Sequence, residues 1–228
     1  MPGLSGHRAA AALALLAAAA LSLALLWPRG SPGWQAAVPA AVEVRASGCG
    51  PAVRRGSGVV VAEERVVTVA HLVAGADSVV VGDVGGRRRP ARPLALDSER
   101  DLALLQVEGL DGRSLAGGEP EAGQQGRVLR FTPSGFDPIR FRLIRRVRAR
   151  IFDLYGSRAA GRDALEIEAA INPGDSGAAL VDDMGALVGI LFASSRRTEG
   201  RAYAVAVSEL RPLLSAPELR EGHFGRCP

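Results

Sequence analysis

The sequence predicts an all-β fold, on three observations. Short runs rich in valine, isoleucine and leucine alternate with turns of glycine, proline and charged residues along most of the chain, which favours strands over helices. Six such runs fall between residues 50 and 110, a spacing that favours a small closed barrel, and a second series follows after residue 125. The 228 residues are enough for one medium-sized domain with an additional segment.

The first 29 residues predict a membrane anchor or a signal segment. Residues 9–26 form an uninterrupted run of 18 alanine, leucine and serine residues, near the lower limit for a helix that crosses a bilayer. Trp27 follows at a position that suits the membrane interface. A cleaved signal peptide is the alternative, although the small-residue site near residues 38–40 lies far beyond the apolar run. Both interpretations place the chain after residue 30 outside the cytoplasm, anchored in the cell membrane or secreted.

Residues 47–215 are predicted to form the folded domain. A linker rich in proline, alanine and glycine is expected at residues 30–46, and a tail at residues 216–228. The domain opens with a hairpin, because two β-branched runs flank the polar turn at Glu63 and Glu64. Five of the strands expected in the first half are residues 59–62, 65–69, 78–81, 92–96 and 101–107.

A glycine-rich polar connection at residues 108–125 leads to a second series of strands. These are residues 126–131, 139–151, 164–169, 178–181, 186–193 and 201–207. In the longest of them arginine alternates with apolar residues, and the alternation changes phase at Ile144 and Arg145, which predicts a β-bulge. A short C-terminal helix is expected at residues 208–214, with Ser208 as its N-cap.

The composition argues against several classes of function. The net charge of +4 is mild, so no nucleic-acid partner is expected. No CxxC motif or cluster of histidine and cysteine is present, so neither a metal site nor a cofactor is expected. The arginines between residues 140 and 150 predict a solvent-exposed face of the sheet, and a contact with anionic lipid or an acidic partner is the alternative.

Residues 171–177, Ile-Asn-Pro-Gly-Asp-Ser-Gly, predict a serine on a tight turn. Its two glycines permit backbone angles that other residues resist, and its proline fixes its own φ. Such a turn can direct neighbouring backbone N–H groups at one point, as an oxyanion hole requires. A serine nucleophile also needs a base, usually a histidine oriented by a carboxylate. His71 and Asp101 are the upstream candidates, and Asp97 is the nearest rival carboxylate.

Three motifs in this order resemble the trypsin-like serine proteases, most closely the HtrA (Deg) branch. They are Val69-Ala70-His71, Asp101-Leu102-Ala103-Leu104-Leu105 and Asn172-Pro173-Gly174-Asp175-Ser176-Gly177. The resemblance covers residues 53–210 and implies a chymotrypsin-like pair of six-stranded antiparallel β-barrels with the catalytic groups between them. No PDZ-like segment follows Val207 in the sequence given.

The resemblance implies a role for each residue of the site. Ser176 would attack the scissile carbonyl and form an acyl-enzyme, His71 would act as general base and then general acid, and Asp101 would orient the imidazole. The oxyanion hole would consist of backbone N–H groups of Gly174, Asp175 and Ser176. No activation site precedes the first barrel, so Asp175 is expected to pair with an arginine instead of a freed N-terminus.

The resemblance also implies a primary substrate pocket. Its lining would be Ala170, Phe192, Ala193, Ser194, Arg201 and Ala202. No acidic residue stands at the base position, Ala170, so the sequence does not support a preference for arginine or lysine. A small or medium apolar residue is expected on the acyl side of the cleaved bond.

Taken together, the sequence predicts an exported, membrane-anchored serine endopeptidase that acts on protein or peptide substrates. The alternatives are an inactive protease-fold module that binds or senses in the cell envelope, and a serine esterase or acyltransferase. Cys49 and Cys227 are expected to form a disulfide in an oxidising compartment, and two free buried cysteines are the alternative.

Overall fold

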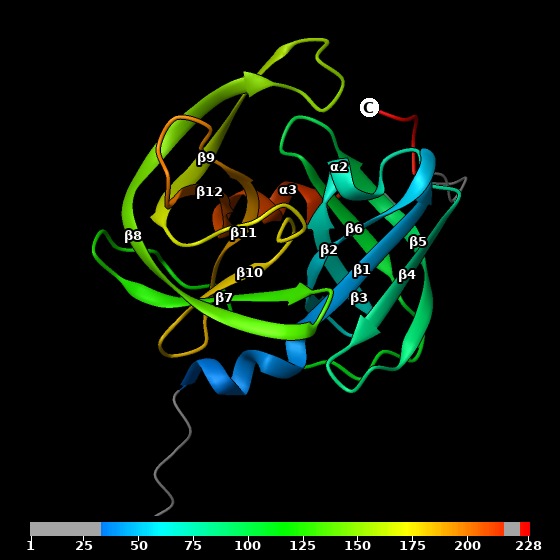
Figure 1. Cartoon of the computed structure of the whole chain (residues 1–228), viewed down its shortest axis with the longest axis horizontal. Coiled ribbons are helices and arrows are strands. Elements are labelled where there is room, and N and C mark those ends of the chain that lie inside the picture. Colours follow the sequence, from blue (N-terminus) through cyan, green and yellow to red (C-terminus); the bar gives the residue numbers. More distant parts are fainter. Residues whose placement is uncertain (1–32, 217–223) are drawn as a thin grey trace, which may run out of the picture. The chain divides into compact units, whose positions relative to one another are not determined.

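The computed structural model describes residues 33–216 and 224–228. The predicted N-terminal anchor or signal helix therefore lies outside the described residues. Within these ranges no helix combines the length and the apolar character needed to cross a membrane. The described chain forms twelve strands in two closed six-stranded barrels (Figure 1). Strands β1, β2 and β3 of the first barrel contact β7, β10 and β11 of the second. The predicted all-β fold with two antiparallel barrels is confirmed.

The first barrel has the strand order β1-β2-β3-β6-β5-β4. Its strands are β1 (Ala41–Gly48), β2 (Gly50–Ala62), β3 (Arg65–Val69), β4 (Ser78–Asp83), β5 (Arg88–Asp97) and β6 (Leu102–Gln106). Valines fill much of its interior, and Val42, Val44, Val59, Val66 and Val81 are fully buried. Each such side chain contributes about 1.5–3 kcal/mol when it leaves water. The β-branched runs of the sequence thus supply both the strands and their core.

The segment expected to be a linker is ordered from Gly33 onward, which corrects the predicted domain boundary at residue 47. A 3₁₀ helix, η1, spans Gly33–Ala40, and β1 follows it directly. Strand β1 pairs with both β2 and β4, so it closes the first barrel. Its apolar residues Ala41, Val42, Val44 and Ala46 are fully buried in the core. The short alternating pattern of this strand was hidden in a region whose proline, alanine and glycine content suggested a linker.

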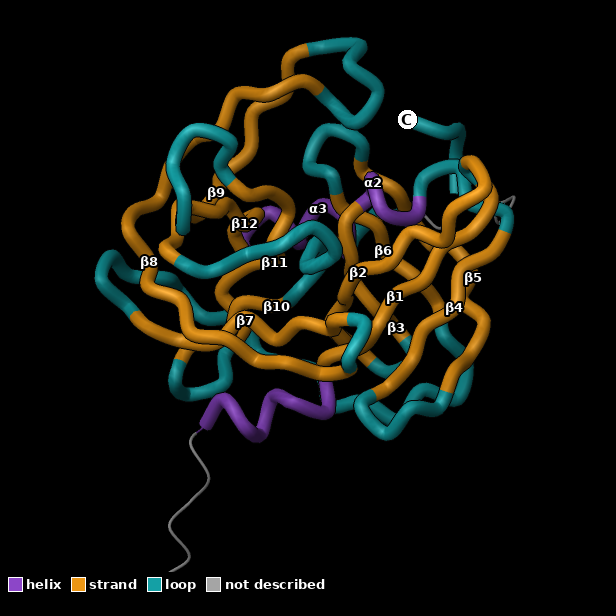
Figure 2. The backbone as a smooth tube through the Cα atoms, in the orientation of Figure 1, coloured by secondary structure: helices purple, strands orange, loops and turns teal. Residues whose placement is uncertain are grey.

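The second barrel has the strand order β10-β11-β12-β9-β8-β7. Its strands are β7 (Gln125–Thr132), β8 (Gly135–Phe152), β9 (Ala159–Glu168), β10 (Ala179–Asp182), β11 (Leu187–Ser194) and β12 (Arg201–Ala206). Figure 2 shows the loops that join these strands, together with the short helices α2 (Ala70–Val73) and α3 (Leu210–Leu214). The predicted bulge in β8 is confirmed, because the register against β9 shifts between Leu143 and Arg145.

The arginines of β8 lie on an exposed face, as the alternation predicts. Three of them pair with acidic side chains of β9 across the sheet. The pairs are Arg142–Glu168 at 2.5 Å, Arg145–Glu166 at 2.7 Å and Arg148–Asp163 at 2.9 Å. Exposed pairs of this kind contribute at most about 1 kcal/mol each, so the face is mainly a solvated surface.

The C-terminal helix is confirmed, but its predicted N-cap is wrong. A 3₁₀ turn, η2 (Val207–Glu209), contains Ser208, and α3 begins after it without a side-chain cap. Leu210 and Leu213 of α3 pack into the core of the first barrel. The helix is therefore placed by this apolar contact, not by capping.

The predicted disulfide between Cys49 and Cys227 is confirmed. The two Cα atoms are 5.8 Å apart, and 178 positions separate the cysteines in the sequence. Phe224, close to Cys227, is buried against the first barrel, and its carbonyl accepts a hydrogen bond from the N–H of Gly75 at 2.8 Å. The bond and this packing fix the C-terminal tail to the β1–β2 end of the first barrel.

Candidate active site

His71 and Asp101 form a hydrogen-bonded pair in the first barrel. His71 lies in α2, directly after β3, and Asp101 precedes β6, which pairs with β3. Asp101 Oδ2 is 2.8 Å from His71 Nδ1, and Asp101 Oδ1 accepts the backbone N–H of His71 at 2.8 Å. Because a carboxylate only accepts hydrogen bonds, Nδ1 carries the ring proton and Nε2 presents a lone pair.

The two side chains differ in their access to solvent. Asp101 is 7% exposed, whereas the imidazole of His71 is 37% exposed. The carbonyl of Asp101 also accepts a hydrogen bond from the N–H of Ala70 at 3.0 Å. Asp101 is therefore hydrogen-bonded to both Ala70 and His71, the first two residues of α2. This arrangement buries the orienting carboxylate and leaves the acceptor side of the imidazole accessible.

The serine turn is bonded to both barrels. The carbonyl of Ser176 accepts the N–H of Ser57 in β2 at 2.8 Å, and the N–H of Gly177 donates to the carbonyl of Leu191 in β11 at 2.8 Å. Gly177 has a φ of +85°, and a Cβ there would overlap the carbonyl of Ser57. Position 177 therefore requires glycine for both its conformation and the close approach of β2.

Two of the three predicted oxyanion donors are free. Within residues 33–216 and 224–228, the N–H groups of Gly174 and Ser176 have no hydrogen-bond partner. The N–H of Asp175 donates to the carbonyl of Asn172 at 3.1 Å, which corrects the expectation that it serves the oxyanion hole. In the same ranges the Ser176 hydroxyl makes no hydrogen bond to His71. Catalytic hydrogen bonds are often long without substrate and tighten when it binds.

Asp175 pairs with an arginine, as the sequence predicts, and the partner is Arg130 of β7. Arg130 Nη1 lies 2.7 Å from Asp175 Oδ2, and both side chains are buried. Burial disfavours the charge on Arg130, but Asp137 and Asp175 outweigh it and raise the pKa of the guanidinium above its ordinary value. Arg130 was not identified from the sequence, although it stands at an inward position of its strand, two residues after the buried Val128.

A cleft of about 290 Å³ lies beside Ser176. It is lined by Ile171, Asn172, Pro173, Ser176, Leu191, Phe192, Ala193, Ser194 and Arg196. Three predicted pocket residues, Phe192, Ala193 and Ser194, are among them. The structure does not place the other three along this cleft. Ala202 is fully buried in the second barrel, Arg201 lies 3.7 Å from Glu166, and the carbonyl of Ala170 accepts a hydrogen bond from Arg130.

A second cleft, of about 440 Å³, also borders the serine turn and shares Asn172 and Pro173 with the first. Its lining combines residues of both barrels with the turn itself: Glu43, Val53, Arg55, Gly56, Phe131, Thr132, Pro133, Asn172, Pro173, Gly174 and Asp175. The sequence did not predict this lining, because β1 and the β7–β8 turn approach the serine only through the packing of the barrels. The serine turn thus lines two clefts.

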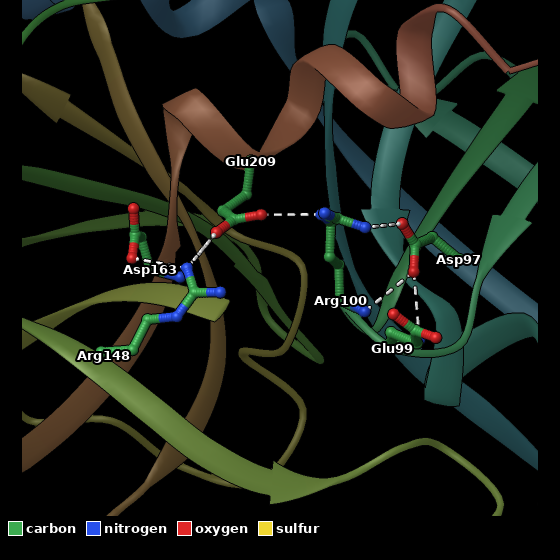
Figure 3. Close-up of polar contacts among 6 residues, drawn as sticks. All are labelled: Asp97, Glu99, Arg100, Arg148, Asp163 and Glu209. Atoms are coloured by element: carbon green, nitrogen blue, oxygen red, sulfur yellow. Dashed lines mark hydrogen bonds and ion pairs between the residues drawn. The ribbon is translucent and has the colours of Figure 1, made fainter. Parts of the chain in front are cut away.

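The rival carboxylate, Asp97, has a structural position in the turn before Asp101. It accepts the N–H groups of Glu99 at 3.0 Å and Arg100 at 2.9 Å, and its Oδ2 lies 2.9 Å from Arg100 Nη1 (Figure 3). Arg100 in turn donates to Glu209 at 2.7 Å. Burial disfavours the charge on Arg100, but Asp97 and Glu209 outweigh it and raise its pKa.

Glu209 extends this network into the second barrel. Its Oε1 accepts the N–H of Asp163 at 2.7 Å and lies 3.4 Å from Arg148 Nη1 (Figure 3). The turn that presents Asp101 is therefore attached, through Arg100 and Glu209, to β8 and β9.

Comparisons with known proteins give consistent matches. The family model described as "Trypsin-like peptidase domain" matches residues 56–190. "Serine protease Rv3671c" of Mycobacterium tuberculosis is 33% identical over 147 residues, which cover 63% of this chain and 37% of that protein. "Probable periplasmic serine protease do/HhoA-like" of Haemophilus influenzae is 30% identical over 185 residues, which cover 75% of this chain and 39% of that protein. "Serine protease Do-like HtrA" of Bacillus subtilis is 29% identical over 189 residues, which cover 75% of this chain and 41% of that protein.

Solved protease structures share the fold of this chain. The active form of the Rv3671c protease from M. tuberculosis superimposes with a TM-score of 0.81 at 28% identity, covering 86% of this chain and 88% of that one. Its inactive form gives a TM-score of 0.71 at 27% identity, covering 81% of this chain and 91% of that one. The chain spans 37–41% of the length of the three curated relatives named above.

Proposed function

Because the chain belongs to the family of trypsin-like peptidase domains, we propose that it is a serine endopeptidase that cleaves proteins or peptides. This membership, together with the homology to HtrA-type proteases, agrees with the resemblance that the three motifs predicted. One observation supports the proposal most: a histidine held by both oxygens of a buried aspartate, together with a serine turn bonded to both barrels.

The proposed reaction follows from these positions. Ser176 attacks the scissile carbonyl while Nε2 of His71 takes its proton, and Asp101 stabilises the imidazolium that forms. The free N–H groups of Gly174 and Ser176 donate to the oxyanion, where negative charge develops. The imidazolium then protonates the leaving amine, and water hydrolyses the acyl-enzyme by the same route.

The cleft beside Ser176 supports a preference for a small or medium apolar residue on the acyl side of the bond. Leu191, Phe192 and Ala193 give it an apolar wall, and its lining contains no acidic side chain. Arg196 adds a positive charge that disfavours arginine and lysine. Cleavage of a peptide library should therefore enrich alanine, valine or leucine at this position, and enrichment of basic residues would overturn the assignment.

We further propose that residues 9–26 anchor the protein in the cell membrane, with the protease domain outside the cytoplasm. The apolar run supports an anchor, and the disulfide suits an oxidising compartment. The relative from H. influenzae is named as periplasmic. Fractionation of cells should find the full chain in the membrane, whereas a mature protein that lacks these residues would support cleavage as a signal peptide.

Hydrolysis of a quenched fluorogenic peptide by the full chain tests the proposed function. The wild type should cleave it, and Ser176→Ala, prepared in parallel and checked for folding, should lose activity to background. The alternative, an inactive protease-fold module, requires a folded wild type without turnover. Equal turnover by both preparations would show a contaminating protease and would contradict the proposed role of Ser176.

A further inference from the structure

Arg162 of β9 has an unusual environment for an arginine. The residue is 3% exposed, and its Nε and Nη1 are buried without a hydrogen-bond partner among the described residues. Burying a charged group without partners costs free energy that burial of an apolar side chain of the same length does not. The fold alone therefore gives no reason for an arginine at this position.

The guanidinium of Arg162 supports the wall of the cleft beside Ser176. Its Cζ lies 4.5 Å from the centroid of the Phe192 ring, a cation–π distance. Phe192 is the extra residue of a bulge in β11, since the register against β12 shifts between Leu191 and Ala193. Bulges change the direction of a side chain near active sites. Arg162 thus contacts the one bulged residue that lines this cleft.

The charge of Arg162 acts on a group of three carboxylates. Burial lowers the pKa of Arg162, and the attraction of Asp101, Asp97 and Glu209 opposes this effect. Asp97 pairs with Arg100, and Glu209 pairs with Arg100 and Arg148 (Figure 3). Within the described ranges, Asp101 forms an ion pair with His71 alone. Asp101 is therefore the one of these three carboxylates that no arginine pairs with directly.

We propose that Arg162 is a positioning residue of the active site, which acts on catalysis through Asp101 and on substrate binding through Phe192. This inference rests on the proposed endopeptidase function. The charge of the guanidinium attracts Asp101 and so acts on the carboxylate that orients His71. Its planar face holds the Phe192 ring in the wall of the cleft.

The two contributions are separable by substitution. Arg162→Met keeps a long unbranched side chain and removes both the charge and the planar face. Arg162→Lys keeps the charge but lacks the planar face that stacks on an aromatic ring. Arg150→Met is the matched control, because Arg150 is an exposed arginine of the neighbouring strand β8.

Measurements of kcat, KM and their pH dependence on the full chain test the proposal. In Arg162→Met, kcat/KM should fall by about 10–100-fold, and the acidic limb of its pH profile should move up by about half a pH unit to one unit, as removal of one nearby charge predicts. The charged and titratable groups around Arg162 and Asp101 are His71, Asp97, Glu209, Arg100 and Arg148. Arg162→Lys should keep the wild-type limb and kcat but raise KM by roughly 3–10-fold, because the cleft wall loses its support.

Thermal unfolding separates this role from a structural one. The midpoint of Arg162→Met should equal or exceed that of the wild type, because an apolar side chain replaces a buried guanidinium whose Nε and Nη1 make no hydrogen bond. Arg150→Met should match the wild type in kcat, KM and pH profile.

Two results would overturn the positioning role. One is an Arg162→Met variant with wild-type kinetics and pH profile, and the other is a loss of activity that only follows a lower unfolding midpoint, with Arg162→Lys unaffected in KM. A wild type that cleaves no peptide would instead overturn the proposed function, and this role with it.

Discussion

Asp101 carries the strongest local constraint in the candidate site. Its φ of +57° lies in the left-handed region, which residues with a Cβ adopt rarely. Such conformations cost on the order of 1–3 kcal/mol and persist where the surrounding contacts determine them. Here the carbonyl of Asp101 bonds to Ala70, and both carboxylate oxygens bond to His71. The conformation is thus maintained by the same contacts that orient the imidazole.

The substitution Asp101→Asn tests this constraint. The amide has nearly the same shape, but its NH₂ group cannot accept a hydrogen bond from Nδ1–H, so the imidazole is expected to adopt the wrong tautomer. We expect kcat to fall by about 10³–10⁴-fold with little loss of folding. Steady-state kinetics and thermal unfolding measure the two effects.

Asp97→Asn is the matched control for that substitution. Asp97 bonds to Glu99 and Arg100 in the preceding turn, so its replacement should lower the stability and leave most of kcat. An Asp97→Asn variant with the larger loss of kcat would identify Asp97 as the catalytic carboxylate instead.

At the scale of the elements, local patterns predicted more than long-range pairings did. The hairpin around Glu63, the bulge near Ile144 and the serine turn were recognisable because each depends on a few neighbouring residues. Strand β1 was missed, although it forms a local hairpin with β2, because the proline, alanine and glycine content before it suggested a linker. The sequence predicted an arginine partner for Asp175, but only the register of β7 selects Arg130.

The lining of the cleft was partly mispredicted for a similar reason. Ala202 was expected in the pocket, but strand β12 turns this side chain toward the barrel interior, where it is fully buried. Which face of a strand lines a cleft depends on its alternation and on the bulges of its neighbours. The stretch at Phe192, which the family resemblance assigned to the pocket, does line the cleft beside Ser176.

The turn between β4 and β5 should make stability depend on pH. Burial tends to raise the pKa of Asp83, but hydrogen bonds and charge from Arg87 outweigh it and hold the pKa below its usual value of 3.8. A lowered folded-state pKa stabilises the protein above the unfolded-state value and loses this contribution as the pH falls through the folded-state value. Asp83→Asn should therefore destabilise at pH 7 and have a smaller effect near pH 3.

Chemical denaturation of the wild type and Asp83→Asn at both pH values measures this difference. Glu108→Gln, an exposed acidic position, serves as the control and should show little difference at either pH. An equal destabilisation by Asp83→Asn at pH 7 and pH 3 would contradict the contribution of its charge.

At the scale of the whole described molecule, the disulfide closes a loop that contains most of both barrels. A loop of this length restricts the unfolded chain by an amount worth up to about 5 kcal/mol, and native disulfides typically contribute about 2–5 kcal/mol. Replacement of both cysteines by serine should lower the free energy of unfolding by about that amount. Reductant should destabilise the wild type similarly and leave the double variant unchanged. A double variant as stable as the wild type would show that the packing of Phe224 suffices to hold the tail.

The proposed role of Ser176 as the nucleophile is tested most directly by a fluorophosphonate probe followed by mass spectrometry of the labelled peptide. The folded full chain should carry one adduct, on Ser176, and the label should disappear in Ser176→Ala and fall sharply in His71→Ala. A folded wild type that takes no label, or a label that persists in Ser176→Ala, would contradict the account.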